Sequence, residues 1–103
     1  MVKVSVLYQN SDGNRFDKAY YLNKHIPMVR QKLGAACKRT EVDEGMAGVQ
    51  PGSKPAFVAA AHFLFDSVEG FQQAFGPHAE AIMADIPNYT NIQPIIQVNE
   101  VRV

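Results

Sequence analysis

Residues 56–65 read Ala-Phe-Val-Ala-Ala-Ala-His-Phe-Leu-Phe, ten positions in which His62 is the only polar side chain. A run this short and this apolar is typical of a central β-strand that is covered on both faces. The stretch before it, residues 50–55, contains two prolines and a glycine and predicts a loop. The chain therefore enters a buried strand from a loop, and the spacing of its apolar residues changes directly after that strand.

The segment that follows the central strand has the three-to-four spacing of an amphipathic helix. Asp66-Ser67 supplies an N-cap and Gly76-Pro77 interrupts the helix, so a further helical segment is expected behind it. Residues 87–90 predict a turn, and residues 91–103 predict a last strand, where Pro94 indicates a sheet edge. The helical side chains expected to face the core are Val68, Phe71, Phe75, Ala79, Ile82, Met83 and Ile86, and those on one face of the last strand are Ile92, Ile96 and Val98.

Upstream of the central strand, the sequence predicts another strand and another helix. Three valines and a tyrosine alternate at positions 2, 4, 6 and 8, which indicates a strand with one buried face. Pro27 removes a backbone donor from the helix that follows and is expected to kink it near residues 24–26, while Gly34 is expected to cap its C-terminus. Residues 36–50 are compatible with a polar edge strand or an irregular loop. The apolar face of the helix is expected to contain Phe16, Ala19, Leu22, Ile26, Val29 and Leu33.

The predicted order of elements is β-α-β-β-α-β. This order indicates an α+β fold of the ferredoxin-like type, with the helices on one face of an antiparallel sheet and the second and fourth strands at its edges. Residues 1–103 are expected to form one domain. Because strand 56–65 is apolar on both sides, the other face of the sheet is expected to be covered by a second copy of the chain, which makes the protein a homodimer.

Composition excludes several functional classes. Ten lysines and arginines balance ten aspartates and glutamates, so the basic excess of a nucleic-acid-binding protein is absent. No apolar run approaches the ~20 residues of a membrane span. A single cysteine, Cys37, forms neither an internal disulfide nor a thiolate metal cluster, and the expected location is the cytoplasm. No close-spaced metal ligands and no phosphate-binding glycine loop occur, so neither a metal nor another cofactor is expected.

Four segments resemble the EthD family. Residues 16–27 have an aromatic-rich start, then a tyrosine, then a His-x-Pro motif, and residues 65–71, 85–90 and 94–101 match further parts of the family pattern in the right order. The family is named for its association with ethyl tert-butyl ether degradation, where its member accompanies a haem monooxygenase system. The resemblance implies a dimeric α/β barrel, in which two four-stranded sheets close face to face with the helices outside.

His25 and Tyr21 are the candidate catalytic residues. They lie four positions apart, so their side chains share one side of the predicted helix. A histidine is a base near neutral pH, and a phenol is a weak acid that can donate to an oxyanion. The alternative is a structural histidine that hydrogen-bonds a carbonyl left free by Pro27. The sequence leaves both interpretations open.

Further residues are assigned to the wall of a pocket for a small apolar organic ligand. Phenylalanines one helical turn apart suit such a wall, tyrosines suit its rim, and a buried histidine needs a hydrogen-bond partner. The parity of the central strand does not say which face His62 lies on. The residues predicted to bind substrate are Tyr20, His62, Phe71, Phe75 and Tyr89.

Two functional hypotheses share this pocket. The first is a cofactor-independent enzyme that isomerises, dehydrates or oxygenates a small apolar substrate in a catabolic pathway, with His25 as acid/base and Tyr21 as its polar partner. The second is a non-catalytic protein that binds such a molecule as an accessory to an oxygenase or degradation system. A closed cleft without a ligand is the third interpretation, and the accessibility of His25 separates it from the other two.

Overall fold

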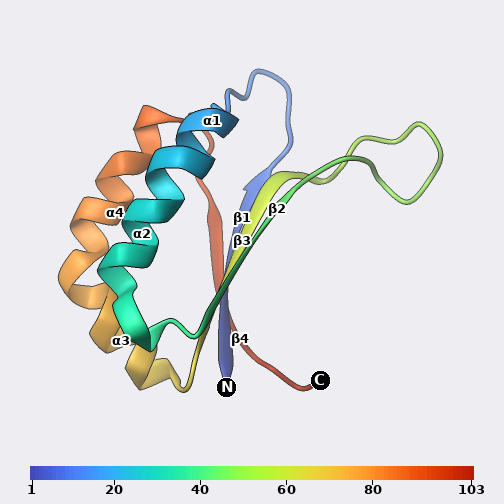
Figure 1. Ribbon diagram of the computed structural model, residues 1–103. Helices are drawn as coiled ribbons and strands as arrows, with labels where there is room; N and C mark the ends of the chain where they lie inside the picture. The colour runs from blue at the N-terminus through green and yellow to red at the C-terminus, as the bar shows by residue number, and fades with distance from the viewer.

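The computed structural model describes residues 1–103 and has the predicted element order (Figure 1). A π-helical turn, Tyr21–His25, joins the first two helices, and short 3-10 turns follow the second, third and fourth. No helix is long and apolar enough to cross a lipid bilayer. The elements are β1 (Val2–Gln9), α1 (Lys18–Tyr20), α2 (Ile26–Leu33), β2 (Arg39–Glu44), β3 (Phe57–Phe65), α3 (Val68–Phe75), α4 (Ala79–Asp85) and β4 (Ile95–Glu100).

The four strands form one antiparallel sheet in the order β2-β3-β1-β4, which confirms the ferredoxin-like α+β fold and the prediction that β2 and β4 are its edges. Figure 1 shows the helices together on one side of this sheet. Val4 pairs with Phe63 on one side and with Val98 on the other, so these three side chains lie on the same face. Val4 and Phe63 are buried there under the helices, and this face carries the core.

The inward face of the first helix differs from the prediction. Ala19 and Leu22 are exposed, while Tyr21 and His25 are buried. The cause is Pro27, whose ring clashes with the carbonyl four residues earlier and which has no N–H to donate to it. A π turn relieves this clash, with the backbone N–H of Ile26 bonded to the carbonyl of Tyr21. The predicted kink is therefore present as a wider turn, and its extra residue rotates Tyr21 and His25 into the interior.

Two other expected core positions are exposed. Val68 and Met83 are each 42% exposed. Val68 is the first residue of α3, where a side chain has fewer helical neighbours to cover it. The 3-10 turn at Gly76–His78 shifts the phase of α4, so Ile82 is fully covered and Met83 lies at the margin of the helix layer.

β4 is shorter than predicted. It begins at Ile95, directly after Pro94, because proline has no N–H with which to continue the ladder. It ends at Glu100, whose partner Val2 is the first residue of β1. Ile92 is buried outside the strand. Residues 39–44 form the polar edge strand, so the open interpretation of the 36–50 stretch is settled in favour of a strand followed by a loop.

The face of the sheet away from the helices is mixed rather than apolar. β3 presents half-buried apolar side chains such as Ala60 and Leu64 there, as predicted. β1 adds Lys3 and Ser5 to the same face, because they pair with Leu64 and His62. The second face therefore differs from the prediction, because β1 adds polar side chains that the spacing of β3 alone does not reveal.

Candidate functional site

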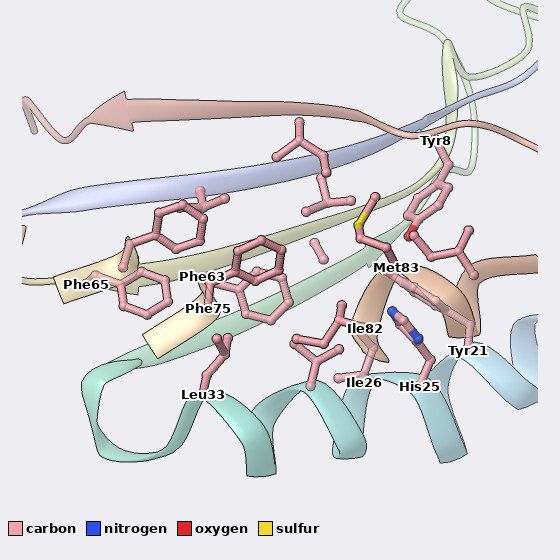
Figure 2. Close-up of a pocket in the computed structure, with 17 residues that line it drawn as sticks. Tyr8, Tyr21, His25, Ile26, Leu33, Phe63, Phe65, Phe75, Ile82 and Met83 are labelled. Atoms are coloured by element: carbon pink, nitrogen blue, oxygen red, sulfur yellow. The ribbon is translucent and has the colours of Figure 1, made fainter. Parts of the chain in front are cut away.

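A cavity of about 90 Å³ lies between the helices and the sheet (Figure 2). It is lined by 17 residues, of which 16 are hydrophobic and His25 is the exception. Figure 2 shows Tyr8 pointing from the sheet and His25 and Tyr21 pointing from the helix at one end of the cavity, with Leu33 and Phe65 at the other. The cavity therefore has an apolar end and an end at which polar ring atoms gather.

Part of the cavity wall is exposed beside β4. Met83 and Ile96 both line it, and they are 42% and 45% exposed. Ile96 lies on the helix face of the sheet because it pairs with Val6, another lining residue. Met83 and Ile96 are the two lining residues that are exposed, and we therefore infer that they form the entrance.

His25 is held by the carboxylate of Asp85. Its Nδ1 lies 2.8 Å from Oδ2 of Asp85, and the hydroxyl of Tyr20 donates to Oδ1 of the same carboxylate at 2.7 Å. Asn88 donates its amide to that oxygen at 3.0 Å. A carboxylate accepts, so Nδ1 carries the proton and Nε2 keeps its lone pair. Nε2 has no hydrogen-bond partner in the chain.

The surroundings keep this pair as a neutral imidazole beside a charged carboxylate. Burial lowers the pKa of His25, and the hydrogen bond and charge of Asp85 raise it without restoring its usual value. Burial raises the pKa of Asp85, but hydrogen bonds from Tyr20, His25 and Asn88 outweigh that effect and lower it overall. At neutral pH, His25 is therefore available as a base.

Tyr21 stacks on His25 and does not hydrogen-bond to it. The two ring centroids are 6.0 Å apart, and the hydroxyl of Tyr21 is buried without any partner. Tyr89 packs closer, at 4.7 Å from the imidazole, and its hydroxyl lies 2.6 Å from that of Tyr8. Burial raises the pKa of Tyr8, Tyr21 and Tyr89, so all three phenols stay protonated.

The structure brings most of the predicted pocket residues to this region. Phe71 and Phe75 line the cavity with stacked rings 5.3 Å apart. Tyr20 and Tyr89 lie behind the lining, where Tyr20 holds Asp85 and Tyr89 holds Tyr8. They support the site without forming its wall.

His62 does not belong to this cavity, and its predicted place there is corrected. It pairs with Ser5 across the strands, on the face away from the helices. Its Nδ1 lies 2.8 Å from the hydroxyl of Ser5, and its Nε2 lies 3.6 Å from Asp43. The alternation of side chains along the strand does not say on which face of the sheet His62 lies. The register of β1 with β3 places it on the face away from the helices.

Asp85 and Tyr8 are the site residues that sequence reasoning missed. Asp85 lies three positions after Ile82, so it continues the inward face of α4 as a charged residue. A carboxylate in that position needs a partner, and this signal was present in the sequence. The partner itself, His25, is 60 positions away in the chain.

No group of three or more His, Cys, Asp or Glu side chains lies close enough together to hold a metal ion. The lining residues that carry polar side-chain atoms are Tyr8, Tyr21 and His25, and the hydroxyl of Tyr21 is enclosed. Such a set can accept one proton and donate hydrogen bonds to a neutral or anionic oxygen.

The model of the EthD domain matches residues 14–93 of the chain. Over 97 residues, the chain is 31% identical to an uncharacterized 11.0 kDa protein in the thcB-thcC intergenic region of Rhodococcus erythropolis, with 88% of this chain and 85% of that protein covered.

Solved structures agree with this match. An EthD-like protein from Ralstonia eutropha JMP134 superposes with a TM-score of 0.94 at 47% identity, over 99% of this chain and 92% of that one. An ethyl tert-butyl ether D (EthD) family protein from Bacillus halodurans C-125 superposes with a TM-score of 0.76 at 22% identity, over 99% of both chains. A dimeric protein of ferredoxin-like fold from Bacteroides fragilis NCTC 9343 gives 0.57 at 17% identity, over 97% and 95%.

Proposed function

This chain belongs to the EthD family, and on that basis we propose that it binds a small apolar organic molecule in the cavity between its helices and its sheet. The observation that carries the proposal is the composition of the cavity wall, 16 hydrophobic residues with one imidazole among them. Ligand pockets typically have this character, an apolar wall with a few polar groups that orient the ligand.

The chemistry that this wall supports best is acid/base catalysis without a cofactor. The free Nε2 of His25 is the proton acceptor, and Asp85 fixes the ring and its tautomer from the opposite nitrogen. Tyr21 is the proposed donor, and because its hydroxyl is enclosed in the empty protein, its ring must turn for that hydroxyl to reach a ligand. Isomerisation and dehydration both use a proton acceptor and a donor in this arrangement.

The second candidate is an accessory protein that binds the same molecule without changing it. The cavity supports both functions equally, and the Asp85-held imidazole is the observation that favours the enzyme. Turnover separates the two: an enzyme loses its reaction in His25→Gln and keeps its ligand, whereas a carrier shows no reaction in either protein.

We also propose that the protein is a homodimer that buries the second face of the sheet. The Bacteroides fragilis relative, which shares the fold, is dimeric. β3 places half-buried apolar residues on that face, and Ile95 of β4, which lies on the same face beyond β1, is 42% exposed. A second copy would cover these side chains and the polar groups among them.

The cavity is tested by closing its entrance. Ile96→Trp places a large ring at the entrance, and Val98→Trp is its control, because Val98 lies two residues further along β4, is 43% exposed and does not line the cavity. Toluene and cyclohexanone serve as probes, and backbone amide NMR signals serve as the readout.

We expect both probes to shift amide signals of cavity residues in the unchanged protein and in Val98→Trp, and to lose this effect in Ile96→Trp. Equal binding in the two variants would mean that the probes bind elsewhere. An unchanged protein that binds neither probe would contradict the proposed function.

A further inference from the structure

His25 is the only residue in the cavity wall that is not hydrophobic, and most of its ring is already in contact with the protein. It is 4% exposed, Asp85 holds its Nδ1, and the rings of Tyr21 and Tyr89 pack against it with centroids 6.0 and 4.7 Å away. His25 lines the cavity, whereas Asp85 and Tyr89 do not. The cavity therefore touches the imidazole on a side other than the one that Asp85 occupies.

Nε2 belongs to that side of the ring. In the five-membered imidazole, the bond between Nε2 and Cδ2 lies opposite Nδ1. Figure 2 shows the ring of His25 directed from its helix toward the middle of the cavity, with a nitrogen at the tip. Because Nε2 has no hydrogen-bond partner in the chain, its lone pair is left for a group inside the cavity.

Hydrogen bonds around Asp85 keep Nε2 an acceptor. Oδ1 of Asp85 accepts from the hydroxyl of Tyr20 at 2.7 Å and from the amide of Asn88 at 3.0 Å, while Oδ2 lies 2.8 Å from Nδ1 of His25. The carboxylate is thus fixed by two donors besides His25, and it requires a proton on Nδ1. Since burial lowers the pKa of His25 and keeps the ring neutral, Nε2 carries no proton.

The rest of the wall presents no free hydrogen-bond donor in the empty protein. The hydroxyl of Tyr21 is enclosed, and that of Tyr8 is engaged with the hydroxyl of Tyr89 at 2.6 Å. The other lining side chains are hydrocarbon, apart from the thioether of Met83. A wall with one unpaired acceptor and no free donor selects a ligand that brings a donor of its own.

We propose that the ligand is a neutral hydroxyl compound, an alcohol or a phenol, whose O–H donates to Nε2 of His25 while its hydrocarbon part extends toward Phe63, Phe75 and Leu33. This assignment rests on the proposed function, since it names the class of molecule that the same cavity takes. One O–H group supplies the single donor that the imidazole lacks, and the remaining carbon atoms lie against the apolar wall.

Other ligand classes fit this wall less well. A ketone or an ether has lone pairs but no proton to donate, so Nε2 would stay unpaired. A carboxylate or an ammonium group would bring charge into a cavity that no charged side chain of opposite sign lines, and such burial is costly. A pure hydrocarbon fills the apolar wall but leaves a buried acceptor without a partner, which costs free energy.

The test compares cyclohexanol with cyclohexanone, which share a six-carbon ring and differ in having an O–H or a C=O group. Both give up hydrogen bonds with water when they enter the cavity, and only the alcohol regains one, at Nε2. Dissociation constants come from backbone amide NMR shifts of the full chain, with toluene as the probe that has no polar group. We expect the alcohol to bind about tenfold tighter than the ketone.

His25→Leu removes the acceptor and keeps an apolar side chain in its place. Cyclohexanol and cyclohexanone should then bind equally well, and toluene binding should be retained, which also shows that the variant is folded. A tenfold preference for the alcohol that survives in His25→Leu would mean that the hydroxyl binds elsewhere, and it would overturn the inference.

Asp85→Asn should reverse the polarity of the imidazole. Because Tyr20 and Asn88 both donate to Oδ1, the oxygen of the introduced amide should take that position, and its NH₂ group should face Nδ1 of His25. Nδ1 then accepts and Nε2 carries the proton. The cavity would offer a donor, so cyclohexanone should bind tighter than it does to the unchanged protein and the preference for the alcohol should vanish. An unchanged preference would contradict the assigned tautomer.

Nitrogen-15 NMR of the imidazole reads the tautomer without any variant. At neutral pH, Nδ1 of His25 should give the signal of a protonated nitrogen and Nε2 that of an unprotonated one. Cyclohexanol should shift the Nε2 signal, and toluene should leave it in place. A protonated Nε2 in the empty protein would overturn the inference.

The remaining outcomes separate this inference from the proposed function. Toluene binding together with equal affinity for cyclohexanol and cyclohexanone would overturn the hydroxyl assignment and leave the apolar-ligand function standing. Tighter binding of cyclohexanone would overturn it as well. Binding of no probe would contradict both the inference and the proposed function.

Discussion

His25 is buried, neutral and held from one side. Its Nδ1 is occupied by Asp85, and its ring is enclosed by Tyr21 and Tyr89. A histidine whose pKa is lowered by burial stays a base where an exposed histidine would begin to take up protons. The lowered pKa that keeps His25 available as a base therefore also makes the stability of the fold depend on pH.

Acid should reveal this link as a loss of stability. The unfolded chain has an ordinary histidine pKa near 6.5 and the folded chain a lower one, so below that pH the unfolded state binds more protons. Stability should then fall as the pH drops through this window and level off below the folded pKa. The measurement is the urea midpoint at about pH 7.5 and about pH 5.5.

His25→Gln should flatten that part of the profile, whatever its effect on stability at neutral pH. A variant with the same slope as the unchanged protein would mean that another group titrates. Asp85, whose pKa is lowered, stabilises the fold above its ordinary pKa of 3.8, and this contribution is lost only as the pH falls below that value. The pH range in which His25 affects stability is therefore distinct from the range in which Asp85 does.

At the residue scale, the sequence pointed to His25 as a candidate but did not reveal its partner. Spacing within one helix relates Tyr21 to His25, and it cannot relate either to a residue in α4. The contact with Asp85 depends on how two helices lie side by side on the sheet, and that is set by packing between segments 60 positions apart.

The helices are short, so hydrogen bonds at their ends contribute noticeably to their stability. α3 has eight residues, none of them fully buried, and it begins at the N-cap Ser67, whose hydroxyl accepts from the N–H of Gly70 at 3.0 Å. A helix of two turns gains little from its own hydrogen bonds, so a satisfied end is a sizeable part of its stability.

Ser67→Ala should cost about 1 kcal/mol of unfolding free energy, because the N–H of Gly70 loses its acceptor. For a domain of this size, that corresponds to a drop of roughly 4–8 °C in melting temperature. Ser67→Asp keeps an acceptor and places a negative charge at the positive end of the helix, so it should melt close to the unchanged protein. Equal losses in both variants would show that the cap is unimportant.

Element order and type were predictable because each strand and helix has its own spacing of apolar residues. The first and last residues of the elements were less predictable. The last strand begins four residues later than the sequence predicts, because Ile92 fits a strand pattern but is buried in the loop that precedes Pro94. The pattern marks burial, and burial also occurs outside strands.

The sheet has helices on one face and none on the other. Ile95 and Val98 of the edge strand β4 are 42% and 43% exposed and lie on opposite faces, because Ile95 pairs with Leu7 and Val98 with Val4. In a face-to-face dimer, the partner would cover Ile95 and leave Val98 free. Because the two side chains are about equally exposed, substitutions at these positions test the two faces of the sheet separately.

Ile95→Glu should therefore dissociate the dimer, because an apolar side chain at the interface would be replaced by a carboxylate that is costly to bury. Val98→Glu should leave it assembled. Sedimentation velocity at micromolar concentration distinguishes the two, and circular dichroism checks that both variants fold. Dissociation in Val98→Glu alone would place the interface on the helix side, and a monomeric unchanged protein would contradict the dimer.

Whole-molecule features were the hardest to obtain from sequence. The apolar run of β3 correctly indicates a strand in the middle of the sheet, but the second face also depends on what the neighbouring strands present. Register places Lys3 beside Leu64 and Ser5 beside His62, and register is a property of pairing, not of any single strand.

The π turn has one more consequence, which is genetic. It is a helical turn with one residue in excess, and in an ordinary helix each residue adds about 100° of rotation. Loss of a single codon between Tyr21 and His25 would replace the π turn by a helix kinked at Pro27 and swing the aromatic side chains before it away from the imidazole. The sheet would be untouched by that event. A single three-base deletion would thus keep the sheet and change the side chains around the cavity. The π turn is therefore a place where relatives with different ligands could diverge in one step.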